Sequence, residues 1–159
     1  RASAPFGWTL GLGFGAMRSA HLNVRIFDPN VWEGTTGFDP LNIILACAIT
    51  LTACIGHASI ASWQGSKIIE HDRARTFFTS ALFRAILILS TVLAVFNPFI
   101  LALIAPIVVW SWFPAHSHWL LSGMTPAAAQ AYRRTLRSSP RHERAAVDRV
   151  RGERVFEED

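Results

Sequence analysis

The sequence predicts an all-α membrane protein with three transmembrane helices, a short Gly-rich N-terminal helix and an Arg-rich helical C-terminal tail. Of its 159 residues, 51% are hydrophobic, and the mean hydropathy is +0.29. The 48 residues from Ala85 to Tyr132 include no Asp, Glu, Lys or Arg. One helix of that length would reach roughly 72 Å, whereas the hydrocarbon core is about 30 Å thick. The run must therefore turn back, and Asn97-Pro98 is its best turn former.

The first predicted span covers residues 41–63, which carry no charge and end at an interfacial Trp followed by Gln64-Gly65. A charged connector follows. The second predicted span, 76–96, contains Arg84, and the third, 99–121, contains Pro106 and Pro114, which could kink or end that helix early.

Positive charge predicts the topology. The chain carries fourteen Arg and one Lys, and eight of the Arg lie in the last 27 residues. Three spans place the 64–75 connector and this tail on the same, positive-inside face, with the residues before 41 on the opposite face. An organellar membrane (mitochondrial inner or thylakoid) or a bacterial inner membrane fits such a chain.

The N-terminal residues 6–16 are apolar and rich in Gly, but Arg18 ends this stretch short of a bilayer thickness. Gly7, Gly11 and Gly15 are spaced by four, so on a helix they would form one smooth stripe that packs against a partner. A flexible Gly-rich terminus is an equally good interpretation. Residues 24–39 are rich in turn formers and predict an irregular loop.

The tail contains two helix starts of the same kind. Thr125-Pro126 and Ser139-Pro140 each offer a capping hydroxyl followed by Pro at the first helical position. We expect these helices to lie on another subunit or on anionic lipid head groups rather than on nucleic acid. The expected organisation is an N-terminal segment (1–40), a transmembrane domain (41–121) and a basic tail (122–159).

Four cationic or titratable side chains fall in or near the predicted spans, where such groups are costly unless they find a partner. An imidazole can be an axial ligand of haem or chlorophyll, and an arginine could bind a propionate, a lipid phosphate or a carboxylate. The alternative, which we favour, is that the arginine extends to the membrane surface and the histidines bond within helix contacts. The candidate cofactor-binding residues are His57, His116, His118 and Arg84.

A ridge of small side chains follows the first span at four-residue spacing, which favours close packing against another helix of this chain or of a neighbour. The ridge consists of Ala46, Thr50, Cys54, Ala58 and Ser62. The aromatic residues of the third span are typical of an interface belt; they are Trp110, Trp112, Phe113 and Trp119.

The sequence holds no phosphate-binding glycine motif, no metal-ligand spacing and no nucleophile elbow, and its spans contain no carboxylate. We therefore expect no enzyme and no metal site. The leading hypothesis is a non-catalytic accessory subunit of a multisubunit energy-transducing complex, respiratory or photosynthetic, which packs against other membrane subunits and binds lipid. The alternatives are a haem- or chlorophyll-binding subunit and a component of a secretion or conjugation channel.

Overall fold

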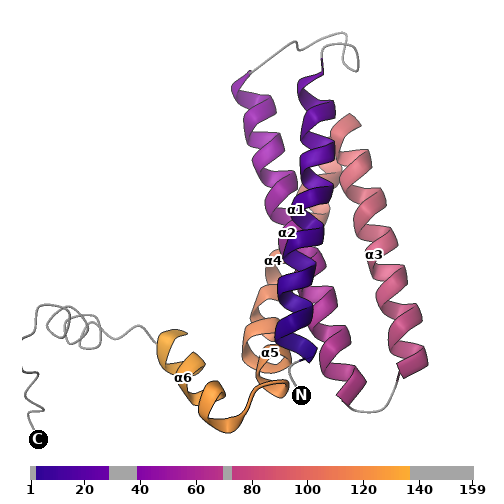
Figure 1. Ribbon diagram of the computed structural model, residues 1–159. Coiled ribbons are helices and arrows are strands. Elements are labelled where there is room, and N and C mark those ends of the chain that lie inside the picture. The colour runs from indigo at the N-terminus through magenta and orange to yellow at the C-terminus, as the bar shows by residue number, and fades with distance from the viewer. Residues whose placement is uncertain (1–2, 29–38, 70–72, 137–159) are drawn as a thin grey trace, which may run out of the picture. The chain divides into compact units, whose positions relative to one another are not determined.

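The computed structural model describes residues 3–28, 39–69 and 73–136, and these residues contain helices and no strand (Figure 1). The chain divides into two units, Arg1–Met124 and Thr125–Asp159. The helices of the first unit are α1 (Ser3–Phe27), α2 (Pro40–Ile69), α3 (Arg73–Phe96), α4 (Phe99–Pro114), the π-helix η1 (Ala115–Trp119) and α5 (Leu120–Ser122).

Three helical segments are long and apolar enough to cross a membrane: Pro40–Ile68, Arg73–Phe96 and Phe99–Ser122. They confirm the three predicted spans; the turn between Phe96 and Phe99 is where it was predicted, and the other four boundaries are extended by one to five residues. The first is the longest because Gln64 and Gly65, expected to end it, continue the helix instead. The chain is therefore a membrane protein of helical class.

The N-terminal helix is longer than the sequence predicts. It was expected over residues 6–16, but α1 runs for 25 residues through Arg18 and Arg25, and Val24 to Phe27 are helical rather than part of a loop. The helix forms despite its glycines because it packs along α2, where Ser3 lies beside Gly65 and Asn23 beside Thr50. These pairs also show that α1 and α2 run antiparallel.

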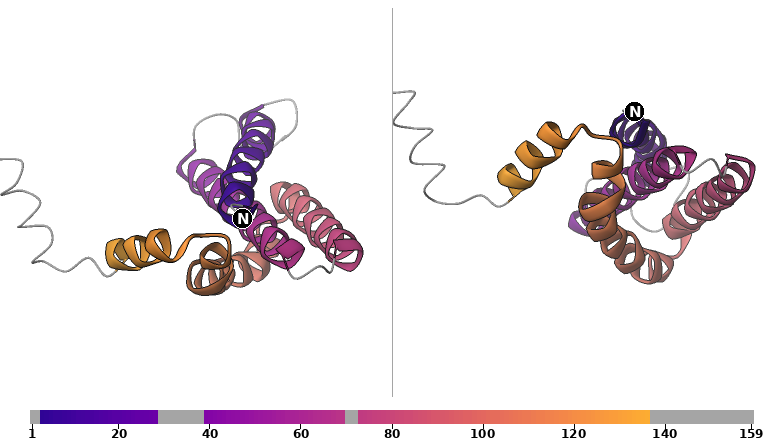
Figure 2. Two further views of the ribbon diagram at one scale, coloured as in Figure 1. Left: turned by 60° about the horizontal axis from the view of Figure 1, so that its bottom comes forward. Right: turned by 90° about the horizontal axis from the view of Figure 1, so that it is seen from below.

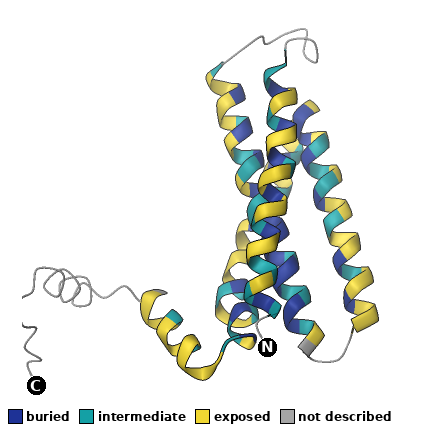
Figure 3. Ribbon diagram, viewed as in Figure 1, coloured by how far each residue is buried: buried dark blue, intermediate teal, exposed yellow. Residues whose placement is uncertain are grey.

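Helix α2 is the centre of the first unit, since α1, α3 and α4 each pack on it (Figure 2). One cluster of buried residues joins all four helices near the end where α2 begins. Its members are Leu22, Ile26, Ala46, Ile49, Ala94, Val95 and Leu101. Large apolar side chains remain exposed on the outer faces of the helices, as expected where lipid is the solvent (Figure 3).

Asn97 precedes the third span, and prolines lie within it. Asn97 starts α4 by accepting a hydrogen bond from the Phe99 amide on its side-chain oxygen (3.2 Å). Pro114 does not end the helix; the next five residues form a π-helix, and the helix continues to Ser122. Each proline removes one backbone N–H from the helix, yet α4 continues through Pro106 and reaches Pro114.

The four long helices alternate in direction (Figure 1). Ile69, Arg73 and Ser122 therefore lie at one end of the first unit, in agreement with three spans that return the connector and the start of the tail to one side. The placement of all residues before 41 on the opposite side was wrong, because α1 runs back along α2 and brings Ser3 to Gly65.

The second unit contains one described helix, α6 (Pro126–Leu136). Thr125 caps it as predicted: its hydroxyl accepts the Ala128 amide at 3.4 Å. The second predicted tail helix, near 140–151, lies outside the described residues.

Candidate functional site

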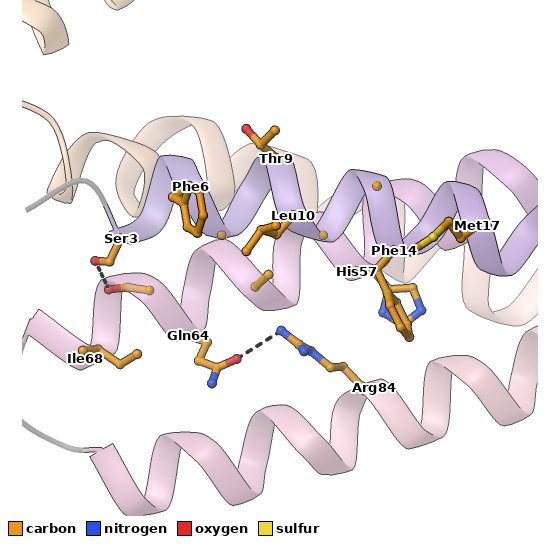
Figure 4. Close-up of a pocket in the computed structure, with 15 residues that line it drawn as sticks. Ser3, Phe6, Thr9, Leu10, Phe14, Met17, His57, Gln64, Ile68 and Arg84 are labelled. Carbon is orange, nitrogen blue, oxygen red and sulfur yellow. Dashed lines mark hydrogen bonds between the residues drawn. The ribbon is translucent and has the colours of Figure 1, made fainter.

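The candidate site is a groove between α1, α2 and α3, with a volume of about 600 Å³, which we call the α1–α3 groove. Helix α1 contributes a largely apolar wall with Ser3 and Thr9, and α2 and α3 contribute His57, Gln64 and Arg84 (Figure 4). The apolar side chains that line it are Phe6, Leu10, Phe14, Met17, Ala61 and Ile68. Because Phe6, Leu10 and Met17 are 58–69% exposed, this wall is open to a bound molecule.

Arg84 supplies the charge of the groove. Its backbone lies eleven residues, roughly 17 Å, after the start of α3. The guanidinium reaches across to α2, where Nη2 donates a hydrogen bond to the Gln64 side-chain oxygen at 3.1 Å. Gln64 is only five residues, roughly 8 Å, before the end of α2. The side chain therefore carries its charge from the interior toward head-group depth, and its Nε is buried without a hydrogen-bond partner among the described residues.

His57 lies deeper in the same groove, seven residues or roughly 10 Å along α2 from Gln64. The side chain is 2% exposed. The edge of its ring meets Phe14 of α1, with ring centroids 4.7 Å apart (Figure 4). Its Nδ1 is buried, and no described residue bonds to it. A buried polar atom without a partner is costly, so His57 is a candidate for a polar contact that the described residues do not supply.

The structure brings Arg84 and His57 together but places the other two candidate histidines elsewhere. His116 stacks on Trp112 with ring centroids 3.9 Å apart, and its centroid lies 4.8 Å from that of Trp8 in a T-shaped contact. Its Nδ1 also bonds to the Trp112 carbonyl at 3.0 Å. His118 is exposed. The continuous helix past Pro114 meets one requirement for a two-histidine haem site, but His57 and His116 belong to separate aromatic clusters.

The predicted packing residues face one another across α1 and α2. A Cβ placed on Gly7 would lie 2.5 Å from the Ala61 carbonyl oxygen, one on Gly11 would lie 2.5 Å from the Ala58 Cα, and one on Gly15 would lie 2.5 Å from the Cys54 Cα. Thr50 accepts a hydrogen bond from Asn23 at 3.0 Å. Within the ridge, Ala46, Ala58 and Ser62 are buried. The partner of the glycine stripe is thus this chain's own second helix.

Three residues that line the groove were not predicted from the sequence: Gln64, Phe14 and Met17. Gln64 was interpreted as the end of a span, although a polar residue one turn inside a membrane helix is a usable signal. Nothing in the local sequence marks Phe14 or Met17, because their role depends on how α1 packs. The described residues include no group of three or more His, Cys, Asp or Glu placed to bind a metal.

Comparison of the chain with models of known protein families, with characterised proteins and with solved structures gave no match. We therefore infer the function from the geometry of the α1–α3 groove.

Proposed function

We propose that the protein is a non-catalytic subunit of a larger membrane complex and that it holds an anionic amphiphile in the α1–α3 groove. One observation supports this most directly: Arg84 and the buried His57 open into the same groove, each with a side-chain nitrogen that no described residue satisfies.

The charge of the groove favours an anion. Arg84 is the one formally charged residue among those that line it, and no carboxylate is among them. A cation in hydrocarbon is costly unless a counter-charge or water reaches it. A phosphate or carboxylate beside Arg84 and Gln64 would supply that counter-charge, and a charge-assisted hydrogen bond contributes roughly 1.5–3 kcal/mol.

The walls of the groove favour an amphiphile rather than a small ion. From Gln64 toward His57 the surroundings become apolar, with Leu10, Phe14 and Met17 along one side. A hydrocarbon chain would bury these side chains, and His57 offers a second polar contact roughly 10 Å from the head group. An anionic lipid has this chemistry, and so does a haem with its propionates.

The experiment is gentle extraction of the tagged chain from its native membrane, followed by mass spectrometry of the bound lipids and proteins and by an absorption spectrum. We expect stoichiometric partner subunits and an anionic amphiphile. Replacement of Arg84 by Gln should reduce the retained amphiphile by about tenfold or more, which corresponds to the loss of about 1.4 kcal/mol or more.

The matched control is Arg75→Gln, which removes the same charge from an exposed position of α3 outside the groove. It should retain the amphiphile at the wild-type level. Equal retention by wild type and Arg84→Gln would contradict the ligand assignment. A visible absorption band that disappears in His57→Ala would identify the ligand as haem or chlorophyll, whereas a colourless sample would favour lipid.

A purely structural subunit is the second candidate, and Trp110 favours it. This residue is 70% exposed, and it lies eleven residues into the 24-residue span Phe99–Ser122. Aromatic belts lie at the membrane interfaces, not at mid-span. A buried indole N–H is usually hydrogen-bonded, so Trp110 requires an acceptor. A neighbouring subunit against this face of α4 would satisfy it. Photo-crosslinking from position 110 should then capture a single protein partner; labelling of lipid alone would contradict this candidate.

The secretion-channel alternative depends on the arginines from Arg133 to Arg154, of which Arg133 and Arg134 lie in the last turn of α6 and the others lie outside the described residues. It remains a prediction, with salt-sensitive binding through the tail as its test.

A further inference from the structure

Three basic side chains of α1 lie at the end of the first unit opposite Arg84. Arg18, His21 and Arg25 are spaced i, i+3 and i+7, which places them on one face of the helix. They line a pocket of about 300 Å³, completed by Leu22 and by the last turn of α3.

The pocket is cationic on one side and apolar on the other. Its α3 wall consists of Val92, Val95 and Phe96, and no carboxylate lines it. Arg18 is half-buried, and its Nε is buried without a hydrogen-bond partner among the described residues. A buried guanidinium nitrogen is costly unless it donates a hydrogen bond. The missing partner is therefore a hydrogen-bond acceptor, and three basic groups in one pocket favour an anionic one.

The depth of the pocket fits a lipid head group. Phe96 is the last residue of α3, and Val92 is four residues, roughly 6 Å, before it. Along α1, Arg18 and Arg25 are eleven and eighteen residues after Gly7, or roughly 16 and 27 Å. Gly7 packs on Ala61 near Arg84's partner Gln64. With a hydrocarbon core of about 30 Å, Arg25 lies near the membrane surface opposite to Gln64, and Arg18 extends the pocket toward the middle of the membrane.

An apolar surface leads from this pocket toward the middle of the membrane. Phe14 and Met17 precede Arg18 on α1, and they are 44% and 69% exposed. A phosphate held between Arg18 and Arg25 would therefore have a side-chain surface along which its hydrocarbon chain could lie.

We propose that Arg18, His21 and Arg25 form a second anion site, which binds the phosphate of an anionic lipid in the leaflet opposite to that of Arg84. Arginine suits this task because its planar group donates two parallel hydrogen bonds to phosphate oxygens. The proposal does not rest on the function proposed for the α1–α3 groove, because its basic residues line a different pocket; the two sites share only the apolar surface of Phe14 and Met17.

The test uses the full chain with Arg84→Gln as background, so that the groove contributes no anion binding. The protein is purified in a neutral detergent and titrated with phosphatidylglycerol, with phosphatidylcholine and with inorganic phosphate, and bound molecules are counted by native mass spectrometry. We expect one phosphatidylglycerol to bind at least tenfold more tightly than phosphatidylcholine. Adding Arg18→Gln and Arg25→Gln should remove that preference.

Two further variants keep the test decisive. Arg25 is exposed, so Arg25→Gln alone should fold normally and still weaken phosphatidylglycerol binding several-fold. Arg25→Lys should weaken it less, because lysine keeps the charge but loses the paired hydrogen bonds. Arg75→Gln, which removes a charge outside the pocket, should have no effect.

Equal binding of the two lipids, or unchanged preference in the Arg18→Gln, Arg25→Gln protein, would overturn the proposal. Inorganic phosphate that binds as tightly as phosphatidylglycerol and displaces it would overturn the lipid assignment and identify the ligand as free phosphate.

Discussion

The α1–α2 pair and the α3–α4 side of the first unit are packed in different ways. Between α1 and α2, glycines let the backbones touch: a Cβ on Gly65 would lie 2.6 Å from the Ser3 carbonyl oxygen. On the other side, larger side chains separate the helices. Leu87 packs over Gly56, and the ring centroids of Trp63 and Phe83 lie 6.1 Å apart. An apolar pocket of about 510 Å³ remains between α2, α3 and α4.

This difference distinguishes the α1–α2 pair, which is the scaffold, from the α3–α4 side, where we propose that ligands bind. Lipid solvates apolar side chains as well as another helix does, so membrane helices associate through close packing and hydrogen bonds rather than through the hydrophobic effect. The α1–α2 pair uses both means along its length. Helices α3 and α4 pack more loosely, and they leave space beside α1 and α2 in which we propose that a ligand binds.

The largest expected effect concerns where α1 lies. If α1 runs beside α2 through the membrane, its first residues and the start of α3 share one face, and its end lies on the other. In a background without Cys47 and Cys54, Ser3→Cys and Arg73→Cys should react with a membrane-impermeant maleimide from the same side, and Asp28→Cys from the opposite side. Reaction of Ser3→Cys and Asp28→Cys from one side would show that α1 does not cross.

The next largest effect compares two glycines of α1, one packed against α2 and one not. Gly11→Ala introduces a methyl group against the Ala58 backbone, whereas the same change at Gly13 meets no atom within 4 Å. The first should destabilise the fold by about 2 kcal/mol through overpacking, and the second should stabilise it by roughly 0.5–1 kcal/mol through helix propensity. Thermal unfolding in detergent should therefore move Tm in opposite directions; equal shifts would contradict close α1–α2 contact.

A smaller effect tests the loosely packed side. Leu87 is 4% exposed and packs against Gly56, whereas Leu89 on the same helix is 59% exposed. Leu87→Ala should cost about 2 kcal/mol, at the low end for buried leucines because lipid can enter the gap. Leu89→Ala should be nearly neutral by the same unfolding measurement. Equal costs would indicate that α3 is not oriented as described.

The smallest effect concerns the hydrogen bond from Asn23 Nδ2 to Thr50 Oγ1. Polar bonds between membrane helices contribute on average about 0.6 kcal/mol. A double-mutant cycle with Asn23→Ala and Thr50→Ala should give a coupling energy near that value. Coupling indistinguishable from zero would mean that this end of α1 separates from α2 in the membrane.

The sequence was sufficient for the three spans because hydropathy and length decide them. It was also sufficient to single out His57 and Arg84, since ionisable groups inside spans are rare. It could not show that α1 continues to Phe27, because Arg18 and Arg25 interrupt its hydropathy and the compensating packing on α2 is not local. For the same reason the i, i+3, i+7 spacing of Arg18, His21 and Arg25 passed without notice: its meaning depends on α3 lying alongside.

The central claim is that close packing of α1 on α2 builds the groove that holds an anionic amphiphile. Gly15 tests it most directly, since it packs on Cys54 but does not line the groove. The measurement is the amount of amphiphile retained by purified Gly15→Ala protein, with Leu89→Ala, a change at an exposed residue outside the groove, as control. We predict severalfold loss in Gly15→Ala and none in Leu89→Ala. Wild-type retention in a Gly15→Ala protein with lowered Tm would contradict the claim.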